Sequence, residues 1–329
     1  MKNFDAEFQD LGQYIRTITE RIWEGRQIED IRQYYSDPCT VETPSSVSTS
    51  VQAVIDGTQA TLAMFPDRRL LAEAVIQSGD EDGGFLSSHR IISPMTHLGD
   101  GMFGKATGKK IHVRTIADCV CKDNRITHEW LVRDQGAIAL QIGSTPQALA
   151  QSWLNQRGGW DKPHAGAVPG YYQSHVSTES MALGYAQAIE NFASATPKVE
   201  LVYDDAVQHM GPCGTTRYGH AEVGAYWRNL FKGLRPQNLT IEHLALQTQD
   251  GCADRVAMRW RARCDAFSDA FSACNQHEIC ATSSEFNSKK TVELMGINHA
   301  EFFRGRILRE WVLIDEVALW MQILQAEKN

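Results

Sequence analysis

Two stretches of the chain carry an aspartate at the end of a strand-like run, and each could form part of a ligand site. They read "EWLVRDQGAIALQI" at residues 129–142 and "EWVLIDEVALWMQI" at residues 310–323. Side chains two positions apart on a strand share a face, so Trp130 lies on the face of Asp134. In the second copy Trp311 shares a face with Asp315. A mainly apolar surface with a few ionisable groups is the usual lining of a small-molecule site, which the pattern therefore favours near each aspartate.

The strand expected before each stretch adds further ionisable side chains. Arg114 and Asp118 share one face in the first copy, and His299 takes the matching position in the second. Tryptophan serves as a core anchor as well as a ligand contact, so both interpretations stay open for the two repeated tryptophans. The residues expected to bind substrate are Trp130, Trp311, His89, His128 and Arg114.

Helix capping is a plainer interpretation of both aspartates. Asp134 precedes "QGAIALQI" and Asp315 precedes "EVALWMQI", and each run is expected to form a short final helix. An aspartate N-cap is worth about 1 kcal/mol, which alone explains its presence in both copies. A functional carboxylate, with or without capping, is the alternative. Glu129 and Glu310 point the other way on their strands, and we expect them on the outer face of a sheet, paired with a base.

The repeat itself indicates a duplicated domain. A period this long is too large for a solenoid unit, and 329 residues are enough for two ordinary domains with full cores. We predict a first domain over residues 1–143, a linker with a short helix over 144–175, and a second domain over 176–329. The linker assignment rests on "RGGWDKPHAGAVPGYY", which is rich in Gly and Pro.

The order of elements predicts the fold class in both halves. Helical spacing comes first, strand-like segments bounded by turn signals follow, and a short helix ends each half. This order is typical of α+β domains with antiparallel sheets and not of alternating α/β folds. The expected helices span 8–22, 28–35, 51–65, 178–194 and 221–234, and the expected strands span 69–79, 84–93, 109–122, 125–134, 238–249, 255–265, 290–303 and 306–315.

Composition excludes several classes of partner. The net charge of −8 argues against a nucleic-acid partner, which needs a basic footprint. No apolar run approaches the length of a membrane span, and the acidic N-terminus does not resemble a signal peptide. We therefore expect a cytoplasmic protein with no membrane partner. The segment "CNQHEIC", with Cys274, His277 and Cys280, offers three soft ligands without an evident fourth, so no metal site is expected.

The chain resembles the SnoaL-like polyketide cyclase family, within the nuclear transport factor two-like superfamily. The first half carries the resemblance in "MFPDRR", "SGDE", "THLGDGMFGKATGKKI" and "DNRITHEWLVRDQGAIALQIG", which stand in the family's order. The second half is more divergent, but it keeps "MRWRARCD" and the ending from Arg306 to Ile323. Outside the linker, the resemblance covers most of the chain.

The resemblance implies a fold and a chemistry. The fold is a cone, in which a strongly curved sheet wraps around the N-terminal helices and leaves a pocket at its open end. The chemistry is a cofactor-free aldol ring closure in which the aspartate at position 134 is the acid/base. Burial raises the pKa of such a carboxylate, so that it can take a proton from a carbon beside a carbonyl. Asp118 is expected to assist Asp134 by like-charge repulsion, and His299 to share a proton with Asp315.

The sequence thus favours cofactor-free proton transfer at carbon on a small apolar carbonyl compound, of the cyclase or isomerase type. A non-catalytic protein that binds a hydrophobic metabolite is the alternative, because the superfamily contains many such binders. Since family domains commonly pair through their sheets, one chain with two domains is expected to form an intramolecular pseudo-dimer.

Overall fold

The computed structural model describes residues 1–162, 167–194, 197–266 and 290–325. The chain divides into two compact units, one of residues 1–149 with 161–175 and the other of 150–160 with 176–329. We call them the N-terminal and C-terminal domains. The expected linker is shared between them, because 150–160 and 161–175 fall in different units. Cys274, His277 and Cys280 lie outside the described residues.

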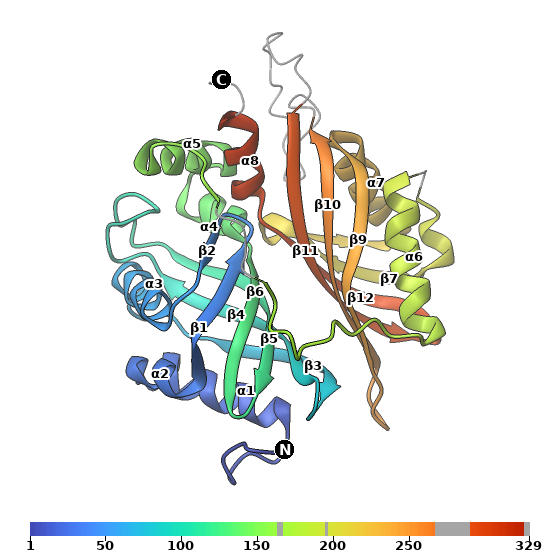
Figure 1. Ribbon diagram of the computed structural model, residues 1–329. Coiled ribbons are helices and arrows are strands. Elements are labelled where there is room, and N and C mark those ends of the chain that lie inside the picture. The colour runs from blue at the N-terminus through green and yellow to red at the C-terminus, as the bar shows by residue number, and fades with distance from the viewer. Residues whose placement is uncertain (163–166, 195–196, 267–289, 326–329) are drawn as a thin grey trace. The chain divides into compact units, whose positions relative to one another are not determined.

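The N-terminal domain begins with helices and continues into strands, as predicted (Figure 1). Its elements are α1 (Leu11–Thr19), η1 (Glu20–Glu24), η2 (Ile28–Asp30), α2 (Ile31–Tyr34), β1 (Tyr35–Thr43), β2 (Ser46–Ser48), α3 (Val51–Met64), β3 (Leu71–Asp80), β4 (Gly84–Thr96), β5 (Lys110–Lys122), β6 (Arg125–Arg133), α4 (Gln135–Ile142) and α5 (Pro146–Arg157). The division between the two units falls within α5.

Local chemistry sets the ends of the first long helices. The Asp10 carboxylate accepts a hydrogen bond from the Gln13 amide at 2.7 Å and so caps α1. Ser50 caps α3 in the same way, with 3.2 Å between its hydroxyl and the Ala53 amide. Residues before a proline avoid the helical conformation, and α3 accordingly ends at Met64, before Pro66.

The first sheet has the strand order β2-β1-β6-β5-β4-β3. Neighbouring strands are antiparallel, except that β1 runs parallel to β6. The expected purely antiparallel sheet is therefore corrected to a mixed one. The difference arises because β1 was not predicted as a strand; it is separated from β6 by most of the domain, and so by the long connection that a parallel pair requires.

One face of this sheet is covered by the domain's own helices. The core joins Leu11, Ile15 and Ile55 of the helices to Ala117 and Cys119 of β5. Because side chains alternate along a strand, the residues between them point to the opposite face. We call the two sides the helix-covered face and the opposite face.

The C-terminal domain repeats this architecture. Its elements are α6 (Ser180–Ser194), η3 (Val199–Leu201), β7 (Tyr203–Met210), η4 (Pro212–Gly214), β8 (Thr216–Tyr218), α7 (Gly219–Gly233), β9 (Leu234–Gln247), β10 (Asp254–Ala266), β11 (Lys290–Phe303), β12 (Arg306–Ile314) and α8 (Glu316–Gln325). The strand order is β8-β7-β12-β11-β10-β9, with β7 parallel to β12. Its helix-covered face carries Met258, Trp260 and Val312, which share a core with α6 and α7.

Strand registers make the two domains comparable residue by residue. Ala117 pairs with Leu131 on one side and His89 on the other. Asn298 pairs with Val312 and Met258 in the same arrangement. The duplication predicted from the repeated stretch thus extends through the sheets, with the same strand order in both domains.

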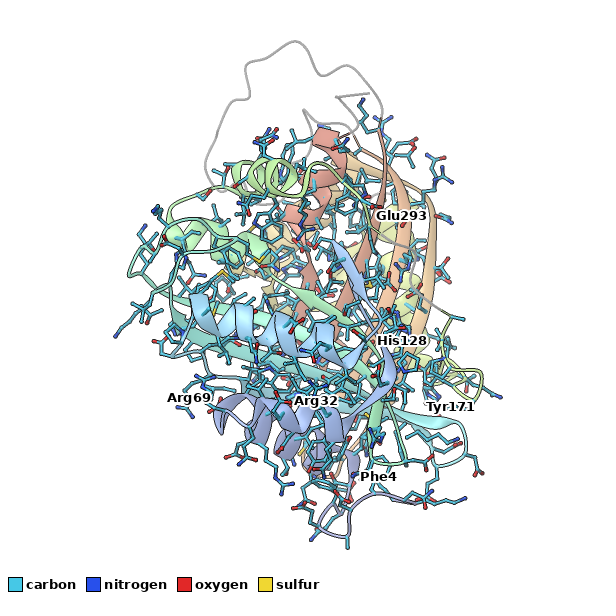
Figure 2. All side chains as sticks on the ribbon, turned by 60° about the vertical axis from the view of Figure 1, so that its left-hand side comes forward. Phe4, Arg32, Arg69, His128, Tyr171 and Glu293 are labelled. Carbon is cyan, nitrogen blue, oxygen red and sulfur yellow. The ribbon has the colours of Figure 1, made fainter. Side chains whose placement is uncertain are left out.

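Lys162 and Tyr171, which follow α5, both contact the N-terminal domain. The Tyr171 hydroxyl lies 2.7 Å from the Thr127 hydroxyl, and the Lys162 ammonium lies 2.9 Å from the Glu42 carboxylate. Tyr171 is labelled in Figure 2. Among the described residues, no helix is both long and apolar enough to cross a membrane.

Candidate functional site

The glutamate that opens each repeated stretch lies on the helix-covered face. Glu129 pairs in register with Cys119, which belongs to the domain core. Its carboxylate accepts a hydrogen bond from the Tyr35 hydroxyl, with 3.0 Å between Oη and Oε2. The expectation that Glu129 and Glu310 lie on the outer face is therefore wrong. Tyr35 begins β1, which is the parallel neighbour of β6.

Burial gives Glu129 an unusual acidity. The pKa of its carboxyl is raised from 4.5 to about 7, mainly because burial disfavours the charged form. The Tyr35 hydrogen bond and the charge of Arg133 act in the other direction. Burial raises the pKa of Tyr35 well above its usual value, so its hydroxyl stays protonated and serves as a donor. A carboxyl that titrates near neutral pH suits general acid/base chemistry.

Glu310 has the same acidity in a different setting. Its Oε1 accepts a hydrogen bond from Tyr185 at 2.5 Å, and its Oε2 accepts one from Tyr203 at 2.9 Å. Trp227 donates in turn to the Tyr203 hydroxyl at 2.9 Å. The His209 Nε2 lies 3.6 Å from Glu310. Burial raises the pKa of Glu310 to about 7 and lowers that of His209 to about 3, so both are neutral at the acidic side of neutrality.

The network around Glu310 extends across the core. Asn298 donates to the Tyr185 hydroxyl at 3.0 Å and accepts from the indole nitrogen of Trp260 at 3.0 Å. The indole of Trp260 lies directly over Gly296, where an added Cβ would come within 2.4 Å of the ring. Trp260, Asn298 and Glu310 are all fully buried. Glu310, Tyr185, Asn298 and Trp260 thus form one hydrogen-bonded network, beside which the two ring nitrogens of His209 have no hydrogen-bond partner within the described residues.

The N-terminal domain has polar atoms on the same face that are not satisfied in this way. His89, Ser93 and Thr115 are each at most 2% exposed. Within the described part of the chain, His89 Nε2, Ser93 Oγ and Thr115 Oγ1 have no hydrogen-bond partner. Burial lowers the pKa of His89 to about 4, so the imidazole is neutral at pH 7. Such groups are expected to bond to a ligand or to water.

Register identifies what replaces these groups in the C-terminal domain. Met258 takes the place of His89, and Ala262 that of Ser93. Gly296, covered by Trp260, takes the place of Thr115. The predicted role of His89 in binding is supported by its location on the helix-covered face, which also carries Glu129, and it stays a prediction.

Both repeated aspartates cap the helices that follow them. The Asp134 carboxylate accepts from the Ala137 amide at 2.9 Å. The Asp315 carboxylate accepts from the amides of Val317 at 3.0 Å and Ala318 at 3.1 Å. The capping interpretation is confirmed for both, whereas the catalytic role stays a prediction.

The partners expected for the two aspartates lie elsewhere. Asp118 pairs in register with Trp130, four residues before Asp134. Such a separation is about 13 Å along a strand, which is too long for a direct like-charge pair. His299 pairs with Trp311 at the same separation from Asp315. The expected proton sharing between His299 and Asp315 is therefore not supported by the register.

The remaining predicted residues lie on the opposite face. Trp130 and His128 are buried there, with their ring centroids 4.1 Å apart (His128 is labelled in Figure 2). Arg114 makes a two-nitrogen contact with Glu73, at 3.0 Å from each guanidinium nitrogen to its nearest carboxylate oxygen. Trp311 is 7% exposed on the corresponding face of the C-terminal domain. The structure therefore does not bring the predicted set together with Glu129 and His89.

Sequence reasoning missed the Glu129–Tyr35 pair. The repeat contained the signal, because the Glu-Trp pair is its most distinctive part and only the tryptophan was assigned to a site. Tyr35 and Glu129 are 94 positions apart and meet through a parallel strand pair, so spacing could not connect them.

Comparison with known families agrees with this architecture. Residues 13–142 match the SnoaL-like polyketide cyclase family, and residues 189–310 match a family described as SnoaL-like domain. The two matches fall on the two sheets with their leading helices. The chain therefore belongs to the SnoaL-like family and carries two such domains in tandem. A comparison with curated proteins finds no match.

Solved structures give likenesses to a single domain. IdmH of Streptomyces antibioticus, assigned as a polyketide cyclase, is 21% identical over 40% of this chain and 96% of its own, with a TM-score of 0.35. AclR of Streptomyces galilaeus, assigned as a hydroxylase, is 18% identical over 40% and 92%, with a TM-score of 0.35. A protein of Jannaschia sp. CCS1, assigned as a SnoaL-like polyketide cyclase, is 11% identical over 43% and 100%, with a TM-score of 0.36. Likenesses this low carry no argument about activity.

Proposed function

We propose that the N-terminal domain catalyses cofactor-independent proton transfer at a carbon beside a carbonyl, with Glu129 as the general base. The observation that carries this proposal is the acidity of Glu129, whose pKa is raised to about 7 by burial. Glu129 is 6% exposed, whereas Glu310 is fully buried. Of the two glutamates, only Glu129 therefore keeps some exposure to solvent.

The chemistry needs little from the protein beyond this base. The Glu129 carboxylate takes a proton from the carbon, and the electron pair of the broken C–H bond moves onto the carbonyl oxygen as an enolate. In a ring closure the enolate carbon then attacks a second carbonyl of the same molecule, and the new alkoxide takes the proton back from Glu129. In an isomerisation the proton returns to another carbon.

Deuterium exchange tests the proposal without knowledge of the natural substrate. The protein is incubated in D2O with a panel of methyl ketones and β-keto esters, and loss of the C–H signal is followed by proton NMR. We expect exchange above the buffer rate with the native chain. Glu129→Gln should lower this excess by about 10²–10⁴-fold, because the amide still accepts from Tyr35 but cannot take a proton.

Glu310→Gln is the matched control, because the same change is made at the equivalent position of the filled domain. Its exchange rate should equal that of the native chain. Equal exchange rates for the native chain and Glu129→Gln would show that Glu129 is not the general base. Ligand binding without any exchange would leave the alternative, a non-catalytic protein that binds a metabolite.

We also propose that the tandem domains act as an intramolecular pseudo-dimer. The support is the duplication itself, since one chain supplies two SnoaL-like domains. Residues 1–175 expressed alone should then self-associate, which sedimentation velocity would detect. A stable monomer of this fragment would contradict the proposal.

A further inference from the structure

Arg68 is a buried cation in the N-terminal domain. It follows Asp67, whose carboxylate accepts from the Thr96 amide at 2.7 Å and the Thr96 hydroxyl at 2.6 Å. It precedes Arg69, which pairs with Glu24 at 3.0 Å and remains 61% exposed on its side chain. Arg68 itself is only 5% exposed. Two adjacent arginines thus point to different surroundings, and Figure 2 shows Arg69 at the margin of the molecule.

Arg68 has no counter-ion within the described ranges. Burial lowers the pKa of Arg68 well below the usual value, and the guanidinium groups of Arg133 and Arg26 lower it further. The carboxylates nearest in sequence, Asp67 and Glu73, are engaged with Thr96 and with Arg90 and Arg114, and Glu24 is engaged with Arg69. A buried, unpaired charge is costly to fold, so its retention calls for an anion that is present when the domain works.

The surroundings of Arg68 belong to the same face as Glu129. The Arg69 amide donates to the carbonyl of Pro94 at 3.1 Å, which places Arg68 beside the end of β4. Ser93, with its unpartnered hydroxyl, lies there on the helix-covered face. Arg133 is the last residue of β6 and pairs in register with Thr115, whose hydroxyl is also unpartnered. Two cations and two free hydroxyl groups therefore lie around one end of this face.

The C-terminal domain lacks this arrangement. Arg263 takes the place of Pro94 and pairs with Asn238, as Pro94 bonds to Arg69. Gln237, the residue before Asn238, therefore takes the place of Arg68. Gln237 donates to Asp265 at 2.7 Å, so it is neutral and already bonded. Ile314 takes the place of Arg133. The charge is specific to the domain whose Glu129 retains some exposure.

We propose that Arg68 and Arg133 bind the carboxylate of an organic ligand, with the Thr115 hydroxyl as a further donor. Two guanidinium groups suit a planar carboxylate, which each can contact through paired N–H groups. This inference rests on the proposed function and names its substrate class, a carbonyl compound that is also an acid. Arg133 and Glu129 are four residues apart on β6, or about 13 Å between their Cα atoms. The carboxylate of the ligand is therefore separated by several bonds from the carbon that loses its proton.

Benzoate and benzamide test the anion site, because they share size and shape but differ in charge. Binding of each to the full-length native chain is measured by isothermal titration calorimetry at pH 7 and low salt. We expect benzoate to bind at least tenfold more tightly than benzamide. Equal affinity of the two probes, or no binding of benzoate, would overturn the proposal.

Three variants locate the binding. Arg68→Met and Arg133→Met should each weaken benzoate binding by at least tenfold, since each removes one charged contact. Arg68→Met should also raise the melting temperature in buffer without carboxylates, because it removes an uncompensated buried charge. Arg69→Met is the matched control, and it should leave benzoate affinity unchanged. Loss of binding in Arg69→Met, or full binding in Arg68→Met, would contradict the assignment.

Glu129→Gln separates this proposal from the catalytic one. The variant should bind benzoate at least as tightly as the native chain, because the substitution removes a negative charge from the same face. Benzoate binding together with lost deuterium exchange would support both proposals. Benzoate binding with unchanged exchange would reject only the base, and exchange without benzoate binding would reject only the carboxylate site.

Discussion

The two domains place one acidic group in the same position and surround it differently. Glu129 and Glu310 occupy equivalent sites, accept from a tyrosine on the parallel neighbouring strand, and have a pKa raised to about 7. Around Glu310 a chain of hydrogen bonds reaches Asn298 and Trp260. In the N-terminal domain Ala117 and Ile91 replace Asn298 and Trp260, and several polar atoms of this face have no partner among the described residues.

This difference separates a structural carboxyl from a functional one. A raised pKa alone does not distinguish them, because burial produces it in both domains. The distinguishing feature is the slight exposure of Glu129, because buried polar atoms without a hydrogen-bond partner occur among the described residues of both domains, at His89 and Thr115 in one and at His209 in the other. A duplicated domain thus supplies its own control: whatever both copies share is sufficient for folding, and whatever only one copy has is a candidate for function.

The largest effect on stability is expected where the C-terminal domain is filled. Trp260→Ala should destabilise this domain by about 3–5 kcal/mol, because it removes a fully buried indole and the donor to Asn298. Hydrogen-exchange mass spectrometry of peptides from β10 and β11 would measure the loss. Ile91→Ala, at the equivalent position of the N-terminal domain, should cost less, since that face is not packed around a large ring. Equal losses would show that the two interiors are equally filled.

Acidity gives the second prediction. The pKa of Glu310 is about 7 in the folded chain and 4.5 in an ordinary setting, so the folded state holds its proton more strongly. The stability it contributes is complete below pH 4.5 and is lost as pH rises to about 7, by an amount on the order of 3 kcal/mol. Glu310→Gln should remove this decline, as chemical denaturation at pH 5 and pH 8 would reveal. His209 has the opposite effect, because its pKa is lowered to about 3 and the stability it contributes is lost as pH falls below 6.5. His209 itself is still present in this variant.

A persistent decline in Glu310→Gln between pH 5 and pH 8, as steep as in the native chain, would contradict the assignment. Glu129→Gln provides the companion measurement, because its carboxyl has a similar pKa. It should remove a further part of the same decline, and the double variant should lose both parts.

Sequence reasoning predicted most of the fold but only part of this contrast. Periodicity and turn signals predicted α1, α3 and the strands β3–β6, where each signal is local. The strand β1 was missed because "YSDPCTVET" contains a proline, which usually marks an edge or a break. Alternation correctly assigned Trp130 and Glu129 to opposite faces of β6. Both faces of this strand are buried, so the sequence did not indicate which of them the helices cover. Tyr35 reaches this face from β1 and Arg68 from the segment before β3, and such contacts depend on the folded topology.

The tyrosine hydroxyls provide the third prediction. Tyr203→Phe removes the donor to Glu310 and the acceptor of Trp227 together, in a site without exposure. It should destabilise the C-terminal domain by about 1–3 kcal/mol. Tyr35→Phe removes a single bond to Glu129, which is slightly exposed, and should cost less. Denaturation followed by tryptophan fluorescence and far-UV circular dichroism would compare them. A greater loss in Tyr35→Phe would contradict the view that the C-terminal network is the tighter one.

The smallest effect is expected at Asp134, where capping and catalysis can be separated. Asp134→Ala should cost about 1 kcal/mol, because it removes the acceptor for the Ala137 amide, whereas Asp134→Asn should be nearly neutral since asparagine caps about as well. Exchange by the Asn variant should match that of the native chain, because Glu129 supplies the base. Asp315→Asn, at the equivalent cap, should behave in the same way. A large loss of exchange in Asp134→Asn, with an unchanged melting temperature, would move the base from Glu129 to Asp134. The family resemblance would then have located the chemistry better than the acidity of the buried glutamate, and the contrast between the two glutamates would concern packing alone.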